Sequence, residues 1–176
     1  MPTTYDLISS NVLVGNSTLI TFSSIPSTFT DLVVTGSVRS AQNTPINAMR
    51  LYFNGNNSSA IHSVTLMQGT GSAISATRVV DQTDIYVGGF VAANTSTNNT
   101  FSSFKIYIPN YRSSINKPLS INNGLPNLAS VTSSWTVEQN AALYRSTSAI
   151  TSISLTNNGQ NFVAGSSFYL HGIKNS

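Results

Sequence analysis

The sequence predicts an all-β protein, an antiparallel sandwich or barrel of about ten short strands with at most one or two short helical turns. Two observations predict this fold class. Hydrophobic residues recur with a period of two wherever a pattern is present, which is typical of strands with one buried face. Serine, threonine and asparagine make up about two residues in five of the chain. These side chains favour turns and outward strand faces over helix interiors.

The strand pattern is clearest in five segments. Leu32, Val34 and Val38 alternate with polar or smaller residues, and Met49, Leu51 and Phe53 do so up to the turn dipeptide Asn54-Gly55. The other three segments place these residues on one face: Phe104, Ile106 and Ile108; Ile153 and Leu155; Phe168, Leu170 and Gly172. Pro109 should end the third segment and Asn157-Asn158-Gly159 the fourth, because proline removes a backbone donor and Asn-Gly pairs adopt tight turns.

Weaker patterns predict further strands at 19–22, 61–67, 76–80, 83–87, 119–121 and 131–137. The best helical candidate is 138–144, which is long enough for only one or two turns. The stretch 93–100 is rich in asparagine, serine and threonine, and between two strands it is expected to form a long polar loop. Gly69-Thr70-Gly71 and Gly88-Gly89 are expected to be hairpin glycines rather than phosphate-binding loops.

Composition excludes several classes of function. The chain has 176 residues, which predicts one domain over 1–176, and only 7% of them are charged. The 8 lysines and arginines are scattered, so they predict no nucleic-acid surface. There is no cysteine for a disulfide or thiolate site, and no apolar run approaches the ~20 residues of a membrane helix. With 5 acids and 2 histidines, we expect no enzyme activity, no metal site and no cofactor.

Two pairs of titratable residues have both a functional and a structural interpretation. Asp81 and Asp84 could serve as paired carboxylates in glycan cleavage, but a turn between Val80 and Ile85, capped by the Asp81 side chain, explains them more simply. His62 and His171 could bind a metal only if distant acids joined them. We interpret both as ordinary surface or strand histidines.

Six aromatic or basic residues are candidate subunit or partner contacts: Tyr107, Tyr111, Arg112, Trp135, Tyr144 and Arg145. Aromatic rings offer a large contact area at low entropic cost, so these residues could line a sugar-stacking or subunit-contact surface. The alternative is that Trp135 and some of the tyrosines fill the core. A surface with so few charges favours packing between subunits, because few ions lose water on contact. We therefore predict a homo-oligomer.

Segments near both ends of the chain carry a family resemblance. Near the start these are Thr4–Ser10 (TYDLISS), 20–26 (ITFSSIP), 29–32 (FTDL) and 50–55 (RLYFNG); near the end they are 144–150 (YRSTSAI) and 162–173 (FVAGSSFYLHGI). They resemble a family of small tailed-bacteriophage virion proteins, common in cyanophages and other aquatic phages. Residues 56–130 share little beyond the strand rhythm. His171 stands where that family usually has a tyrosine.

The resemblance implies a jelly-roll-like β-sandwich displayed on a phage particle, with no catalytic residues. The chain shows neither a heptad or β-repeat shaft nor a shaft-binding segment, which favours a capsid decoration (cement) protein over a tail fibre. We expect a homotrimer on the virion surface, assembled in the host cytoplasm, that binds the major capsid protein without nucleic acid or membrane. The alternative is a tail-fibre or appendage subunit that binds host glycans, through Trp135 or Tyr111. An enzyme that trims capsule polysaccharide is the third possibility.

Overall fold

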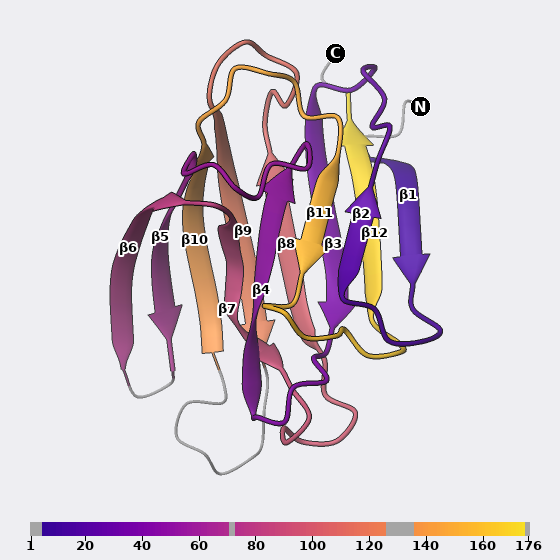
Figure 1. Cartoon of the computed structure of the whole chain (residues 1–176), viewed down its shortest axis with the longest axis vertical. Coiled ribbons are helices and arrows are strands. Elements are labelled where there is room, and N and C mark those ends of the chain that lie inside the picture. Colours follow the sequence, from indigo (N-terminus) through magenta and orange to yellow (C-terminus); the bar gives the residue numbers. More distant parts are fainter. Residues whose placement is uncertain (1–4, 71–72, 126–135, 175–176) are drawn as a thin grey trace.

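The computed structural model describes residues 5–70, 73–125 and 136–174, which form twelve β-strands in two antiparallel sheets and contain no helix (Figure 1). The large sheet has the order β1-β12-β3-β8-β9-β10-β5-β6, and the small sheet has the order β2-β11-β4-β7. The strands are β1 (Asp6–Val12), β2 (Leu19–Phe22), β3 (Asp31–Val38), β4 (Ile46–Phe53), β5 (His62–Gly69), β6 (Ile74–Gln82), β7 (Ile85–Ala92), β8 (Ser102–Ile108), β9 (Lys117–Leu125), β10 (Thr136–Tyr144), β11 (Ile153–Thr156) and β12 (Ser167–Ile173). The predicted all-β sandwich is confirmed.

Eight of these strands have jelly-roll connectivity. Without β5, β6, β9 and β10, the sheets reduce to β1-β12-β3-β8 and β2-β11-β4-β7. Consecutive members of this set lie in opposite sheets, except β4 and β7, which pair with each other. This is the double Greek-key arrangement of a jelly roll. The four other strands extend the large sheet, so β5 and β6 lie beyond β7, the edge strand of the small sheet (Figure 1).

The core forms between the inner faces of the two sheets, where the predicted period-two residues meet. Met49, Leu51 and Phe53 are fully buried on β4, as are Ile106 and Ile108 on β8. The predicted turns are also present: Asn54 and Gly55 both have positive φ, and so do Asn158 and Gly159. In each case the residue after glycine donates its backbone N–H across the turn, so the strand ends are fixed where the sequence predicted them.

Two local predictions are wrong. Residues 138–144 are not helical but belong to β10, which is bonded to β9 on one side and to β5 on the other. Pairing along both edges overrides the helix preference of Ala141, Ala142 and Leu143. Gly88 and Gly89 lie inside β7 rather than in a hairpin turn. Of the strand expected at 131–137, residues 131–135 lie outside the described part of the chain.

Two buried cations hold the polar loops in place. The Arg39 guanidinium donates to the carbonyls of Thr97 and Thr100, at 2.9 and 2.7 Å, within the loop that joins β7 to β8. The predicted long polar loop is thus present and folded around a charge. The Lys117 ammonium donates to the carbonyls of Ile115, Ser146 and Ser148 at 2.7 to 2.9 Å. Nothing in the sequence around Arg39 or Lys117 indicates this structural role.

Candidate functional site

Of the six predicted contact residues, the five that the structure describes do not form one exposed site. Tyr111 and Tyr144 are almost fully buried, and the Tyr144 ring packs against Phe53 in the core. Tyr107 is half-buried on the outer face of β8 and donates its hydroxyl to Asp31 at 2.8 Å. Arg112 is exposed, and Trp135 lies outside the described residues. The buried rings of Tyr111 and Tyr144 therefore serve the core, which is the alternative considered for them.

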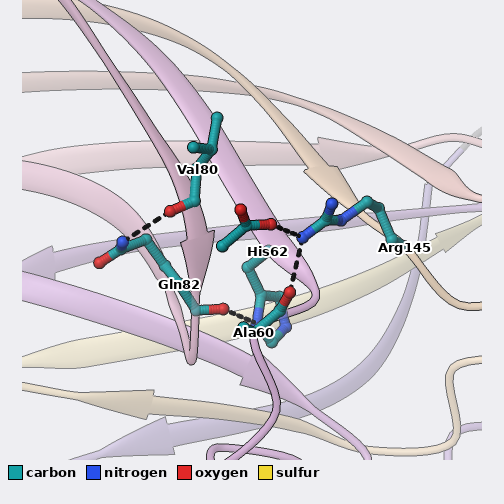
Figure 2. A network of polar contacts seen from close by, with 6 residues as sticks. Ala60, His62, Val80, Gln82 and Arg145 are labelled. Atoms are coloured by element: carbon teal, nitrogen blue, oxygen red, sulfur yellow. Dashed lines mark hydrogen bonds and ion pairs between the residues drawn. The ribbon is translucent and has the colours of Figure 1, made fainter.

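Arg145 clamps the start of β5 against the end of β6. Its guanidinium donates to the Ala60 carbonyl at 2.6 Å and to the Asp81 carboxylate (Figure 2). Asp81 has a positive φ of 55° near the end of β6, ahead of the turn that joins β6 to β7, and its carboxylate bonds to Arg145 rather than capping that turn. Asp84 pairs with Arg50 instead, at 2.8 Å. Each carboxylate is thus bonded to a different arginine, which gives both a structural role.

His62 is a core residue on β5. Its ring is fully buried, stacks on Tyr144 at 5.2 Å and contacts the Gln82 carbonyl through Nδ1 at 3.2 Å (Figure 2). Burial lowers the pKa of His62, because the charged imidazolium would lose its water. His171 lies on β12 near Tyr5, so the two histidines are on different strands of the large sheet. Within the described ranges, no group of three or more His, Asp or Glu side chains could hold a metal ion.

A cleft of about 320 Å³ opens where the large sheet extends beyond β7. Its lining comes from five strands: Ala48, Leu66, Gln68, Thr77, Val79, Tyr86 and Glu138. Leu66 and Val79 are partly buried and pack against the core, so one side of the cleft is apolar. Gln68, Thr77 and Glu138 add an amide, a hydroxyl and a carboxyl group. The cleft thus combines apolar surface with a few polar groups, the usual character of a small-molecule site.

Tyr86 is the aromatic residue of this cleft, and two other side chains hold it. The Arg50 guanidinium lies over its ring, 3.6 Å from the ring centre, and bonds to Asp84. A guanidinium over an aromatic face is attracted by the electron density of the ring. Asp84 therefore fixes Arg50, and Arg50 fixes the ring, so the aromatic surface is preorganised. The sequence places Arg50 and Tyr86 36 residues apart, and only the pairing of β4 with β7 brings them together.

Polar side chains replace apolar ones where β10 passes beneath β7. Thr136, Glu138 and Asn140 are buried on the inner face of β10, and Asn123 is buried beside them on β9. Asn123 Nδ2 donates to the Glu138 carboxyl at 3.0 Å, and Asn140 Nδ2 lies 3.4 Å from the Val87 carbonyl on β7. Since β7 is an edge strand, its outward backbone groups need partners, and Asn140 provides one for the Val87 carbonyl.

Exposed apolar side chains gather at the two lateral ends of the large sheet. At the β1 end these are Tyr5, Leu7, Val12 and Val14, and at the opposite end they are Met67, Ile74, Val80 and Val137. Ile74 and Val137 are 80% and 71% exposed, and both are paired in register with Gly69. Met67, Ile74 and Val137 therefore form a contiguous group, called here the β5–β6–β10 patch. Patches of this kind on a folded chain mark interaction surfaces.

No known family model matches this chain, and no curated protein does. Among solved structures, the chain is similar to a carbohydrate-binding module, CBM66, from Bacillus subtilis. It has 8% sequence identity and a TM-score of 0.24, over 98% of this chain and 94% of the other. A similarity at this level supports no conclusion about function. In the part of the chain that the structure describes, no helix is long and apolar enough to cross a membrane.

Proposed function

We propose that this chain is a non-enzymatic bacteriophage virion protein, a capsid decoration (cement) protein that binds the outer surface of the major capsid lattice. The observation that carries the proposal is the exposure of apolar side chains at both lateral ends of the large sheet. A sheet edge with exposed apolar residues is a liability for a protein that works alone. In a protein that packs side by side with other subunits, both ends of the large sheet can serve as contact surfaces.

The low charge of the chain supports the same proposal. With 7% charged residues, few ions would lose their water when the ends of the sheet pack against other subunits. A trimer of this chain would contact several capsid subunits at once. Modest individual contacts then add up through effective concentration, which suits a protein that stabilises a shell. The contacts would consist of strand edges, polar loops and apolar side chains rather than salt bridges.

The location on the particle tests the proposal first. A gold-labelled antibody against this protein is applied to the parent particle, and the label is located by electron microscopy. We expect many copies spread over the head, and particles that lack the protein should lose their genome at a lower temperature. Label confined to the tail would contradict the proposal and favour an appendage subunit.

The contact surface is tested with single substitutions at each end of the large sheet. Leu7→Lys and Val137→Lys each place a charge on an exposed side chain, so the fold should be retained while docking is weakened. We expect binding to particles that lack the protein to fall at least about tenfold for one or both variants, measured by co-sedimentation. Ile115→Lys is the matched control, because Ile115 is equally exposed but lies in the loop between β8 and β9. Wild-type binding by both variants would rule out these ends as contacts.

A further inference from the structure

We propose that the cleft beside β7 binds a neutral saccharide. This binding activity is separate from docking on a capsid, because the cleft and the proposed contacts use opposite faces of the same strands. On β5 and β10 the cleft residues Leu66, Gln68 and Glu138 alternate with the exposed Met67 and Val137. The binding requires only the side chains described above. An isolated chain therefore suffices to test it.

The dimensions of the cleft suit a small ligand. Its volume of about 320 Å³ lies at the lower end of the range for small-molecule sites, roughly 300–1,000 Å³. Leu66 and Val79 provide apolar surface on the side of the β5–β6 hairpin, and Tyr86 provides an aromatic ring on the side of β7. This size fits one or two sugar rings rather than a long polymer segment.

The lining of the cleft has both the aromatic surface and the polar groups that a pyranose ring requires. A sugar ring has C–H groups on its faces, which pack on aromatic surface, and hydroxyl groups at its rim, which need hydrogen bonds. Tyr86 offers the ring, and Gln68 and Thr77 offer an amide and a hydroxyl group beside it. The Glu138 carboxyl, which already accepts a hydrogen bond from Asn123, completes the lining. The Tyr86 ring is already fixed by Arg50, so little side-chain entropy is lost on binding.

The charges of the cleft favour a neutral ligand over an acidic one. Glu138 is the carboxyl group in the lining, and its residue is 1% exposed. An acidic sugar would have to bring its own carboxylate into this poorly hydrated place, which is costly. The nearby cation, Arg50, already has Asp84 as its ion-pair partner at 2.8 Å. A uronic or sialic acid is therefore expected to bind more weakly than a neutral hexose.

A peptide strand is a poorer occupant of the same place. Addition of a strand to β7 would need its outward backbone groups to be accessible. Asn140 Nδ2 already lies 3.4 Å from the Val87 carbonyl, and Asn123 packs against Gly88 so closely that an added Cβ would lie 2.3 Å from Nδ2. The large sheet thus covers this part of the β7 edge, and the open space lies beside it at Tyr86.

The test measures saccharide binding by the purified full chain. A panel of neutral mono- and oligosaccharides, with uronic and sialic acids as acidic counterparts, is titrated into labelled protein and followed by NMR chemical shifts. We expect one or more neutral sugars to shift residues of the cleft. Tyr86→Leu and Gln68→Ala should each weaken that binding at least tenfold. Gln68→Ala keeps the test decisive if the tyrosine variant fails to fold.

The matched control is Tyr52→Leu, which changes a tyrosine on the neighbouring β4 strand that does not line the cleft. It should bind like the wild type. Absence of binding by every neutral sugar at millimolar concentration would overturn the inference, as would unchanged binding by both cleft variants or a preference for acidic sugars. None of these results bears on capsid binding, which is measured with particles.

Discussion

The buried imidazole of His62 makes the stability of the fold dependent on pH. The histidine of the unfolded chain titrates near pKa 6.5, whereas burial lowers the pKa of His62 in the folded protein. Between the lowered pKa and 6.5 the unfolded chain binds more protons, so acid favours unfolding in this window. We expect the free energy of unfolding to fall as the pH decreases below about 6.5, and His62→Phe to lose less stability between pH 7 and pH 5.

Urea unfolding at the two pH values measures this difference. His171→Phe is the control, because it removes the other histidine without changing the core. Carboxylates contribute to the acid dependence of all three proteins, and this contribution cancels in the comparison. An identical loss of stability in His62→Phe and the wild type would contradict the assigned role of His62.

Lys117 is a fully buried cation whose three N–H donors are used by three backbone carbonyls. Burial lowers the pKa of its ammonium, yet removing the group would leave these carbonyls without their donor. We expect Lys117→Met to destabilise the fold by about 2–3 kcal/mol, the cost of unsatisfied buried polar groups. Chemical denaturation measures the change. Lys105→Met, at an exposed position of β8, should have a much smaller effect, and equal effects would contradict this account.

The packing of β7 depends on a single glycine, Gly88. A Cβ added at Gly88 would lie 2.3 Å from Asn123 Nδ2 and 3.1 Å from the Glu138 carboxyl, so an alanine must displace the polar row beneath β7. We expect Gly88→Ala to cost about 1–3 kcal/mol, as for other overpacked interiors. Gly124→Ala on β9 is the control, because the added Cβ would be 3.5 Å from Ser103, an ordinary contact. Thermal unfolding of both variants tests this, and equal stability would contradict it.

The elements with apolar inner faces could be predicted from the sequence, and those with polar inner faces could not. On β4 from Met49 onward and on β8 from Phe104 onward, every second residue is a large hydrophobic one, so the alternation is plain. On β10 the buried positions include Thr136, Glu138 and Asn140, which hide the period of two. What remains visible in the sequence is a run of helix formers, Ala141-Ala142-Leu143, and this explains the wrong helix prediction. β1 lacks an obvious alternation because most of its side chains are exposed.

At the scale of the whole molecule, the cleft could not be predicted, because its lining depends on which strands become neighbours. β10 pairs with β9, which precedes it in the sequence, but also with β5, which is distant in the sequence. The sequence contains Tyr86, Gln68 and Glu138 but no spacing that joins them. The sequence shows where the aromatic residues are but not which of them are exposed. Tyr111 and Tyr144, predicted as contact residues, are buried in the core. Whether an aromatic residue is buried depends on the face of the strand that it occupies. The alternation of apolar and polar residues does not define this face reliably at the end of a strand.

The pairing of β1 with β12 affects how the chain can fold. Asp6 lies opposite Gly172, and β2 likewise pairs with β11, Leu19 opposite Thr156. During translation, β1 and β2 cannot pair until β12 and β11 have been synthesised. A topology with such distant pairings folds slowly, on a millisecond-to-second scale or longer, and exposes sticky strand edges meanwhile. We therefore expect the newly made chain to need chaperone protection until it is released, and to unfold slowly once its sheets have closed.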